Sequence, residues 1–310
     1  MSHYNQNISQ DAILKFDILS QDDNTRLYYL EKETDVSITD IDMYDSDVMK
    51  EFALGRTEMI SEFNTNYSTN VTKQVSPQKF SDLVAISGLT HGKGLWDDNA
   101  DVLLKNGKEI SELITSRENF KRLLMQYGVE EVLSNKIVEF IRKGKLHSSK
   151  NKAANQIEWK KYEEVLRQHH VEEWFIESIK KVRYLFPLAH AAAYVINAYR
   201  LAWYKIYYPL AFAKVMINQS LSDKDVDKSI FLKDREQIDG LIKKYENPKT
   251  YYTLPNKTRK SSAQIYFMRW LFTSHIELLK ADVDKSEDKI ALIEGKNIRL
   301  PLMIKRFVDK

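Results

Sequence analysis

The sequence has 310 residues, of which 43% are hydrophobic and 29% are charged, and it carries a net charge of +3. This is the composition of a globular chain of roughly two domains, large enough to bury a core without a metal or disulfide staple. The absence of Cys excludes a disulfide scaffold, a cysteine nucleophile and a thiolate zinc site. Because Gly and Pro are scarce, we expect a mostly helical fold. With no apolar leader and no charge-free apolar stretch, we also expect a cytoplasmic protein that makes no membrane contact.

The first predicted element is a strand over residues 13–19, which are apolar except for Lys15 and Asp17. Alternation along a strand places these two side chains on one face. An unpaired buried carboxylate is costly, so Asp17 must be satisfied or functional. A turn is predicted next at Asp22 and Asp23, and the polar residues 64–78 indicate a linker or a surface loop.

A third of the glycines of the chain lie close together at Gly88, Gly92 and Gly94. A Gly-rich loop can bring backbone N–H groups to a phosphate. Lys93 is followed by Gly rather than by Ser or Thr, so this run is not a Walker A loop. Taken alone, the pattern indicates phosphate binding only weakly.

Three helices are predicted after the glycines. Residues 115–118, Thr-Ser-Arg-Glu, have the pattern of a capping box and open a helix that ends at Gly128. A second helix is predicted over residues 130–143, with Arg142 at its negative end, where cations are favoured. A third, polar helix is predicted within residues 148–168.

Acids and bases are unevenly distributed along the chain. In residues 11–62 acids outnumber bases by nearly three to one, whereas residues 178–222 contain no Asp or Glu. The cations of this acid-free window are Lys180, Lys181, Arg183, His190, Arg200, Lys205 and Lys214. Since carboxylates repel phosphates, a cationic surface without acids suits a polyanionic partner. A buried apolar helix that has no use for acids is the alternative.

The acid-free window contains a predicted helix that begins at Pro187 and ends or kinks at Pro209. Its helical periodicity predicts an apolar face made of Ala192, Val195, Tyr199, Ala202, Trp203 and Ile206. The opposite face carries His190, Tyr194, Asn197, Leu201 and Lys205. Cations and an aromatic ring beside a helix N-terminus can hold a phosphate and stack a base. Alternatively, His190 and Tyr194 only pack against a neighbouring domain.

The chain beyond Asp223 is mixed in sequence and highly charged up to residue 256. Further on, residues 290–293 and 298–300 are short apolar runs joined through Glu-Gly-Lys-Asn. This spacing predicts a β-hairpin near the C-terminus.

Several blocks of the sequence share their order and approximate spacing with one known family. They are Leu83-Val-Ala-Ile-Ser-Gly-Leu-Thr-His-Gly-Lys-Gly94 with Trp96 and Asn99-Ala100, Ser116-Arg117, Phe140-Ile-Arg-Lys-Gly-Lys145, and Trp174-Phe-Ile-Glu-Ser-Ile-Lys-Lys181 leading into Phe186-Pro-Leu-Ala-His-Ala-Ala-Ala-Tyr194. In these blocks the chain resembles PolC-type DNA polymerase III alpha subunits, the replicative polymerases of low-GC Gram-positive bacteria and mycoplasmas.

The resemblance implies a mainly α fold: a helical fingers domain, a small α/β palm remnant at the N-terminus and a β-hairpin near the C-terminus. Residues 1–62 would be the C-terminal part of the palm and residues 63–222 the fingers. Residues 223–310 would be a charged helical region with the hairpin, leading toward a missing helix-hairpin-helix and clamp-binding part. The first two palm carboxylates, an Asp-x-Asp, would lie upstream of residue 1.

The activity that the resemblance implies is two-metal nucleotidyl transfer from a dNTP to a primer 3′-hydroxyl. Leu14-Lys-Phe-Asp-Ile-Leu19 is similar to a family motif whose Asp binds metal, so Asp17 is the expected catalytic Mg²⁺ ligand, with Lys15 beside it. The other implied partners are primer–template DNA, a dNTP, the rest of the alpha chain and the replisome. The residues expected to contact nucleotide or DNA are His91, Arg117, Arg142, Lys181, His190, Tyr194 and Arg200.

The sequence departs from the family pattern at three positions. Leu188 stands where the family usually has Lys, Gly94 where it has Asp, and Asp98 where it has Gly. With a single metal carboxylate the chain is expected to be inactive alone, which leaves open whether it is an enzyme. The alternative is a non-catalytic DNA-binding remnant of a decayed polymerase gene, which would bind DNA in a salt-sensitive way without nucleotide dependence. A purely structural helical protein, the third possibility, would have no DNA affinity at moderate salt.

Overall fold

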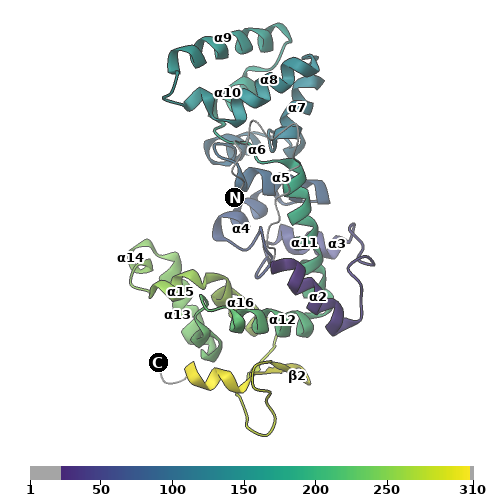
Figure 1. Ribbon diagram of the computed structural model, residues 1–310, viewed down its shortest axis with the longest axis vertical. Helices are drawn as coiled ribbons and strands as arrows, with labels where there is room; N and C mark the ends of the chain where they lie inside the picture. The colour runs from purple at the N-terminus through teal and green to yellow at the C-terminus, as the bar shows by residue number, and fades with distance from the viewer. Residues whose placement is uncertain (1–21, 308–310) are drawn as a thin grey trace, which may run out of the picture.

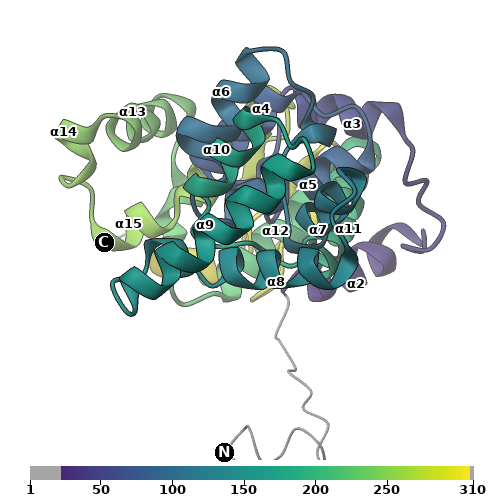
Figure 2. The same ribbon diagram turned by 90° about the horizontal axis from the view of Figure 1, so that it is seen from above.

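The computed structural model describes residues 22–307, and most of these residues are helical. Helices stack along an elongated molecule, with α9 at one end and a small β-sheet at the other (Figure 1). Figure 2, viewed along the long axis, shows α13, α14 and α15 projecting to one side of this stack. The predicted mainly α fold is confirmed. The predicted strand that carries Lys15 and Asp17 lies outside the described residues.

The helices of the first half are separated by short connections. In chain order they are α2 (Asp22–Thr34), α3 (Ser46–Ala53), α4 (Asn66–Val75), α5 (Phe80–His91), α6 (Asp101–Lys105), α7 (Arg117–Gln126), α8 (Glu131–Arg142) and α9 (Lys152–Gln168). The second half continues with α10 (Glu173–Lys181), α11 (Leu188–Tyr207), α12 (Pro209–Ser222), α13 (Arg235–Glu246), α14 (Pro248–Tyr251), α15 (Asn256–Lys260) and α16 (Ser262–Thr273). No helix among residues 22–307 is both long enough and apolar enough to cross a membrane.

Two segments that were predicted as a turn and a loop are helices. Residues 22 and 23 open α2 instead of forming a turn, and the buried Asp23 accepts a hydrogen bond of 2.6 Å from the Ser61 hydroxyl. The predicted linker over residues 64–78 contains α4, which begins at a reciprocal capping box of Thr65 and Ser68. The polar composition was misleading because α4 buries one side, at Val71 and Thr72, and exposes the other.

The helices predicted at 115–128 and 130–143 are present, although the first is capped differently. Ser116, not Thr115, caps α7 by accepting from the N–H of Asn119 at 3.2 Å. Asn119 returns the bond by accepting from the N–H of Thr115 at 2.9 Å. The carboxylate of Glu118 is therefore free of the capping role that the sequence pattern predicted, and it contacts α11 instead.

The centre of the fold is α11, which begins after Pro187 and ends before Pro209, as predicted. It packs against α5 and also against α2, α3 and α12. Because it is covered from several sides, the prediction of one buried face and one open polar face is wrong beyond its first turns. Leu201 and Lys205 are as buried as Tyr199.

The predicted hairpin is confirmed, and it belongs to a three-stranded sheet. The strands β2 (Leu292–Glu294) and β3 (Asn297–Arg299) pair antiparallel, with Ile293 opposite Ile298. A third strand, β1 (Leu278–Leu279), pairs parallel with β3 and is too short to leave a sequence pattern. The sheet packs against α12.

Candidate nucleic-acid interface

Most of the residues predicted to contact nucleotide or DNA lie near the segment 181–188, which runs from the last residue of α10 through an extended connection to the first residue of α11. We call it the 181–188 linker. Backbone hydrogen bonds hold it to two other parts of the chain. The N–H of Arg183 donates to Lys93 O at 2.8 Å, and the N–H of Lys93 donates to Tyr184 O at 3.1 Å. The N–H of Arg117, at the start of α7, donates to Phe186 O at 3.0 Å.

Two glycines allow the linker to pass close to neighbouring backbone. A Cβ on Gly94, which has a φ of +71°, would lie 2.0 Å from Lys181 O. A Cβ on Gly144 would lie 2.8 Å from Arg183 O. The N–H of Gly92 donates to Gly88 O within α5, and that of Lys93 is taken by the linker. The phosphate-loop interpretation is therefore wrong for these two N–H groups, and the glycine at position 94 serves close packing.

A row of rings runs from the end of α5 to the start of α11. His91 stacks on Phe186, with centroids 5.0 Å apart and an interplanar angle of 29°. Phe186 contacts His190 at 6.2 Å, and His190 contacts Tyr194 at 6.4 Å. His190 is exposed and Tyr194 is half-buried. The structure thus brings together three of the predicted contact residues, His91, His190 and Tyr194. It adds Phe186, which was not predicted as a contact.

Three of the cations near the linker have acidic partners, and two of these partners lie within three residues of the cation in the sequence. Arg117 pairs with the Glu118 carboxylate at 2.7 Å, and His91 Nε2 lies 3.2 Å from Glu62. Arg142, at the end of α8, pairs with Glu139, and this hydrogen bond lowers the pKa of Glu139 to about 2. A phosphate bound here would have to compete with these carboxylates.

The N-terminus of α11 is already occupied by a carboxylate of the chain itself. Glu118 accepts from the N–H of Leu188 at 2.7 Å. Burial raises the pKa of Glu118, but the hydrogen bonds from Leu188 and Arg117 outweigh it, so the pKa is lowered. The prediction that the helix end is open to a phosphate is therefore wrong for its first N–H group.

The remaining predicted contacts lie at the edge of the interface or beyond it. Lys181 donates to Asp98 O at 2.5 Å. Arg200 is half-buried and lies about 15 Å along α11 from His190, at about 1.5 Å per residue. Arg183 was not among the predicted contacts, although it is exposed on the linker and forms no ion pair with another described residue. Its position within the acid-free window was the signal that could have identified it.

Two further cations of the acid-free window are paired inside the fold. Lys205 is buried and lies 2.7 Å from the carboxylate of Glu58, and Lys214 lies 2.6 Å from that of Glu33. The acid-rich and acid-free regions therefore do face each other. At these two positions, however, their charges neutralise one another, and the predicted open placement of Lys205 is wrong.

The part of the chain that the structure describes contains no group of three or more His, Asp or Glu side chains able to hold one metal ion. The expected ligand Asp17 and its neighbour Lys15 lie outside that part.

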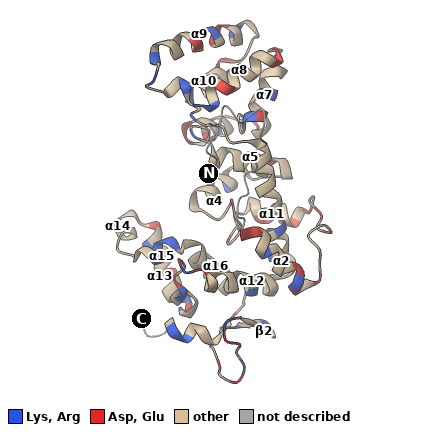
Figure 3. Ribbon diagram, viewed as in Figure 1, with Lys and Arg blue, Asp and Glu red and all other residues tan. Residues whose placement is uncertain are grey.

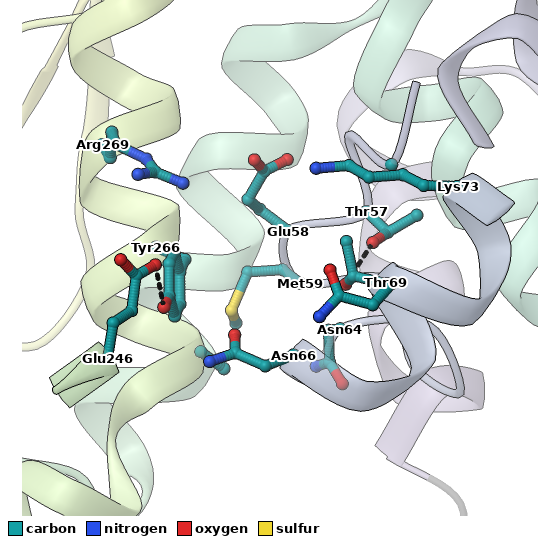
Figure 4. Close-up of a pocket in the computed structure, with 13 residues that line it drawn as sticks. Thr57, Glu58, Met59, Asn64, Asn66, Thr69, Lys73, Glu246, Tyr266 and Arg269 are labelled. Carbon is teal, nitrogen blue, oxygen red and sulfur yellow. Dashed lines mark hydrogen bonds between the residues drawn. The ribbon is translucent and has the colours of Figure 1, made fainter. Parts of the chain in front are cut away.

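A separate polar cavity of about 260 Å³ lies between residues 55–73 and the helices α13 and α16. Figure 4 shows Lys73 and Arg269 pointing toward Glu58 from opposite sides. Glu58 is the partner of the buried Lys205, so its carboxylate stabilises the fold. The cavity shares no residue with the 181–188 linker.

Comparison with known proteins identifies the family of the chain. The family model described as the bacterial DNA polymerase III alpha subunit finger domain matches residues 22–169. The chain is 38% identical over 226 residues to the PolC-type DNA polymerase III of Ureaplasma parvum, 34% over 284 residues to that of Mycoplasmopsis pulmonis and 36% over 244 residues to that of Bacillus subtilis. These matches cover 68%, 86% and 74% of this chain but only 15%, 19% and 16% of the relatives, so the chain spans less than a fifth of their length. The chain therefore belongs to the family of PolC-type DNA polymerase III and includes its fingers domain.

Proposed function

We propose that the chain forms the fingers of a replicative DNA polymerase and contacts primer–template DNA and the incoming dNTP around the 181–188 linker. The observation that carries this proposal is the ring row of His91, Phe186, His190 and Tyr194, in which both histidines are exposed. Aromatic rings stack on bases whatever the base sequence. A replicative polymerase needs such sequence-independent contacts.

The cations around the row would act on phosphates. Arg183 is exposed and lacks an acidic partner within residues 22–307, so it can bind a phosphate at no cost to the fold. Arg117 and Arg142 would exchange Glu118 and Glu139 for a phosphate, and Lys181 would exchange Asp98 O. Each exchange replaces one charged or polar contact by another, so the affinity of the site would be moderate and sensitive to salt. Arg200 would contact DNA further along α11.

For catalysis we propose Asp17 as one ligand of Mg²⁺, with Lys15 beside it, on the strength of the sequence resemblance over residues 14–19. Bound magnesium would stabilise the attacking and leaving oxygens of nucleotidyl transfer. The remaining ligands would come from the rest of the alpha chain, which with the replisome would act in the cytoplasm. The fingers residues would orient the triphosphate and the template.

The binding proposal can be tested by fluorescence anisotropy with a labelled primer–template, with and without a matched dNTP and Mg²⁺. The His190→Ala/Tyr194→Ala double variant should weaken binding at least about fivefold, because base stacking is worth about 1–3 kcal/mol per base. Tyr44→Ala, at a tyrosine that is 90% exposed elsewhere, should bind like the wild type. Equal DNA affinity with and without the dNTP would favour the hypothesis of a non-catalytic remnant. No DNA binding at moderate salt would refute both the polymerase and the remnant hypotheses.

The catalytic proposal has its own test. The 310 residues alone should not extend a primer, and extension would refute the dependence on further carboxylates. In a reconstitution with the upstream part of a PolC-type relative, Asp17→Asn should abolish extension, whereas Asp40→Asn, at an exposed acid, should not. An unchanged rate in Asp17→Asn would remove Asp17 from the mechanism.

A further inference from the structure

A second cationic surface lies on α13, α14 and α15, away from the 181–188 linker (Figure 1). Residues 243–260 contain one acid, Glu246, and the cations Lys243, Lys244, Lys249, Lys257, Arg259 and Lys260. All except Arg259 are exposed. We call these six cations, together with Tyr251 and Tyr252, the α13–α15 patch. Blue segments mark α13 and α15 in Figure 3.

The cations of the patch have no acidic partners, unlike His91, Arg117 and Arg142 near the linker. None of them forms an ion pair with any residue between 22 and 307. Glu246, the single acid, accepts instead from the Tyr266 hydroxyl at 2.9 Å. Six cations in 18 residues repel one another, and no ion pair within residues 22–307 offsets that repulsion. A polyanionic ligand would offset it.

Aromatic rings connect the two basic helices of the patch. Tyr245, next to Lys244 at the end of α13, contacts Tyr251 at 5.4 Å, and Tyr251 contacts Tyr252 at 5.0 Å. The guanidinium carbon of Arg259, from α15, lies 5.5 and 5.4 Å from the centres of the Tyr251 and Tyr252 rings.

The Arg259 contacts hold Tyr252 in a defined position. Even so, 78% of Tyr252 is exposed, so the residue leaves a large aromatic surface open to solvent. Burying that surface against another ring would be favourable, and the guanidinium of Arg259 already lies beside the Tyr252 ring.

We propose that the α13–α15 patch binds a single strand of nucleic acid, with a base stacked on Tyr252 and the phosphates on the surrounding lysines. A duplex keeps its bases stacked on each other, so an open ring among cations fits a single strand better. An acidic protein would satisfy the lysines but has no particular use for the exposed ring. The proposal rests on the proposed function for the identity of the strand, which would be the DNA template of the same polymerase.

The test is fluorescence anisotropy of the whole chain with a labelled 20-nucleotide single strand and with a 20-base-pair duplex. The Lys243→Ala/Lys244→Ala double variant should weaken single-strand binding and reduce the slope of log affinity against log salt by about 1.4, because each neutralised phosphate of a single strand adds about 0.7 to that slope. Tyr252→Ala should weaken binding at least about fivefold. The matched controls are Lys160→Ala/Lys161→Ala, another exposed adjacent pair, and Tyr44→Ala, and both should bind like the wild type.

Four outcomes would overturn the proposal. They are an equal loss in the Lys160/Lys161 control, equal affinity for the duplex, wild-type binding by Tyr252→Ala, and wild-type binding by the Lys243/Lys244 variant. Thermal unfolding followed by circular dichroism verifies that each variant is folded. If the patch variants bind normally while the His190/Tyr194 variant does not, the patch proposal fails and the proposed function stands. The reverse pattern removes the linker from DNA binding and retains the patch.

Discussion

Lys205 lies in the packed centre of the fold, and replacing it by Met would remove its ammonium while keeping an apolar stem of similar length. The residue is 4% exposed. Its ammonium donates to a Glu58 carboxylate oxygen at 2.7 Å, to Arg56 O at 3.0 Å and to Glu58 O at 3.3 Å. All three N–H groups of the ammonium therefore have acceptors inside the protein. Burial lowers the pKa of Lys205, and the charge of Glu58 opposes that effect.

The expected loss of stability follows from what Lys205→Met leaves behind. Removing one partner of a buried ion pair costs about 3–5 kcal/mol, because the other charge stays buried without compensation. Here the Glu58 side chain is 19% exposed, so water can partly solvate the remaining carboxylate. We therefore expect a loss near the lower end of the range, about 3 kcal/mol. Adding Glu58→Gln should recover part of it, since no charge is then left unpaired.

The assay is urea unfolding followed by circular dichroism, with Lys214→Met as the matched control. Lys214 pairs with Glu33 at 2.6 Å, but its side chain is 17% exposed and that of its partner 28%. Such a pair is worth about 1 kcal/mol or less. If Lys205→Met unfolded at the same urea concentration as Lys214→Met, Lys205 would be solvated as the sequence had suggested, and the packing described for α11 would be wrong.

Two substitutions and one titration test the region around the linker. Gly94→Ala should lower the free energy of unfolding by about 2–4 kcal/mol, because the added Cβ overpacks the site and the φ of residue 94 is positive. The control is Gly240→Ala, inside α13 with open space around it, which should raise that free energy by up to about 1 kcal/mol. Thermal unfolding of both variants measures the difference. The carboxyl carbon of Glu139 should titrate in NMR near pH 2, because the hydrogen bond from Arg142 lowers the pKa of Glu139 in the fold. The pair therefore stabilises the protein above the ordinary Glu pKa, and this stabilisation is lost as the pH falls through 2. A titration at the ordinary Glu pKa would refute the pairing. Leu188→Lys should tighten primer–template binding and steepen the slope of log affinity against log salt by about 0.7–0.9. An unchanged slope in the anisotropy assay would show that residue 188 does not face a phosphate.

Local signals in the sequence were sufficient for most of the helices. Pro187 and Pro209 marked the two ends of α11, and the helix predicted over residues 130–143 matches α8 closely. The linker-like segment that became α4 shows where such signals fail. Its capping box pairs Thr65 with Ser68 rather than with the more familiar Glu or Gln, so the start of the helix was missed.

The environment of a side chain was harder to predict than its helix. A helical wheel placed His190 and Lys205 on one polar face, yet the first is exposed and the second is buried. The wheel describes one helix, whereas Lys205 is covered by Arg56 and Glu58, which follow α3, and by Trp270 of α16. Likewise the carboxylate of Glu62 becomes a neighbour of His91 only through the fold.

The acid-free window shows why charge segregation in a sequence is ambiguous between an internal and an external partner. Residues 178–222 contain no acid, but Lys205 and Lys214 form ion pairs with Glu58 and Glu33 of the acid-rich region. Charge complementarity inside a fold therefore produces the same sequence pattern as a polyanion-binding surface. What separates the two is whether the cations are paired once the chain has folded. On that criterion four cations of the window, Lys181, Arg183, His190 and Arg200, form no ion pair within residues 22–307, and neither do the lysines of the α13–α15 patch.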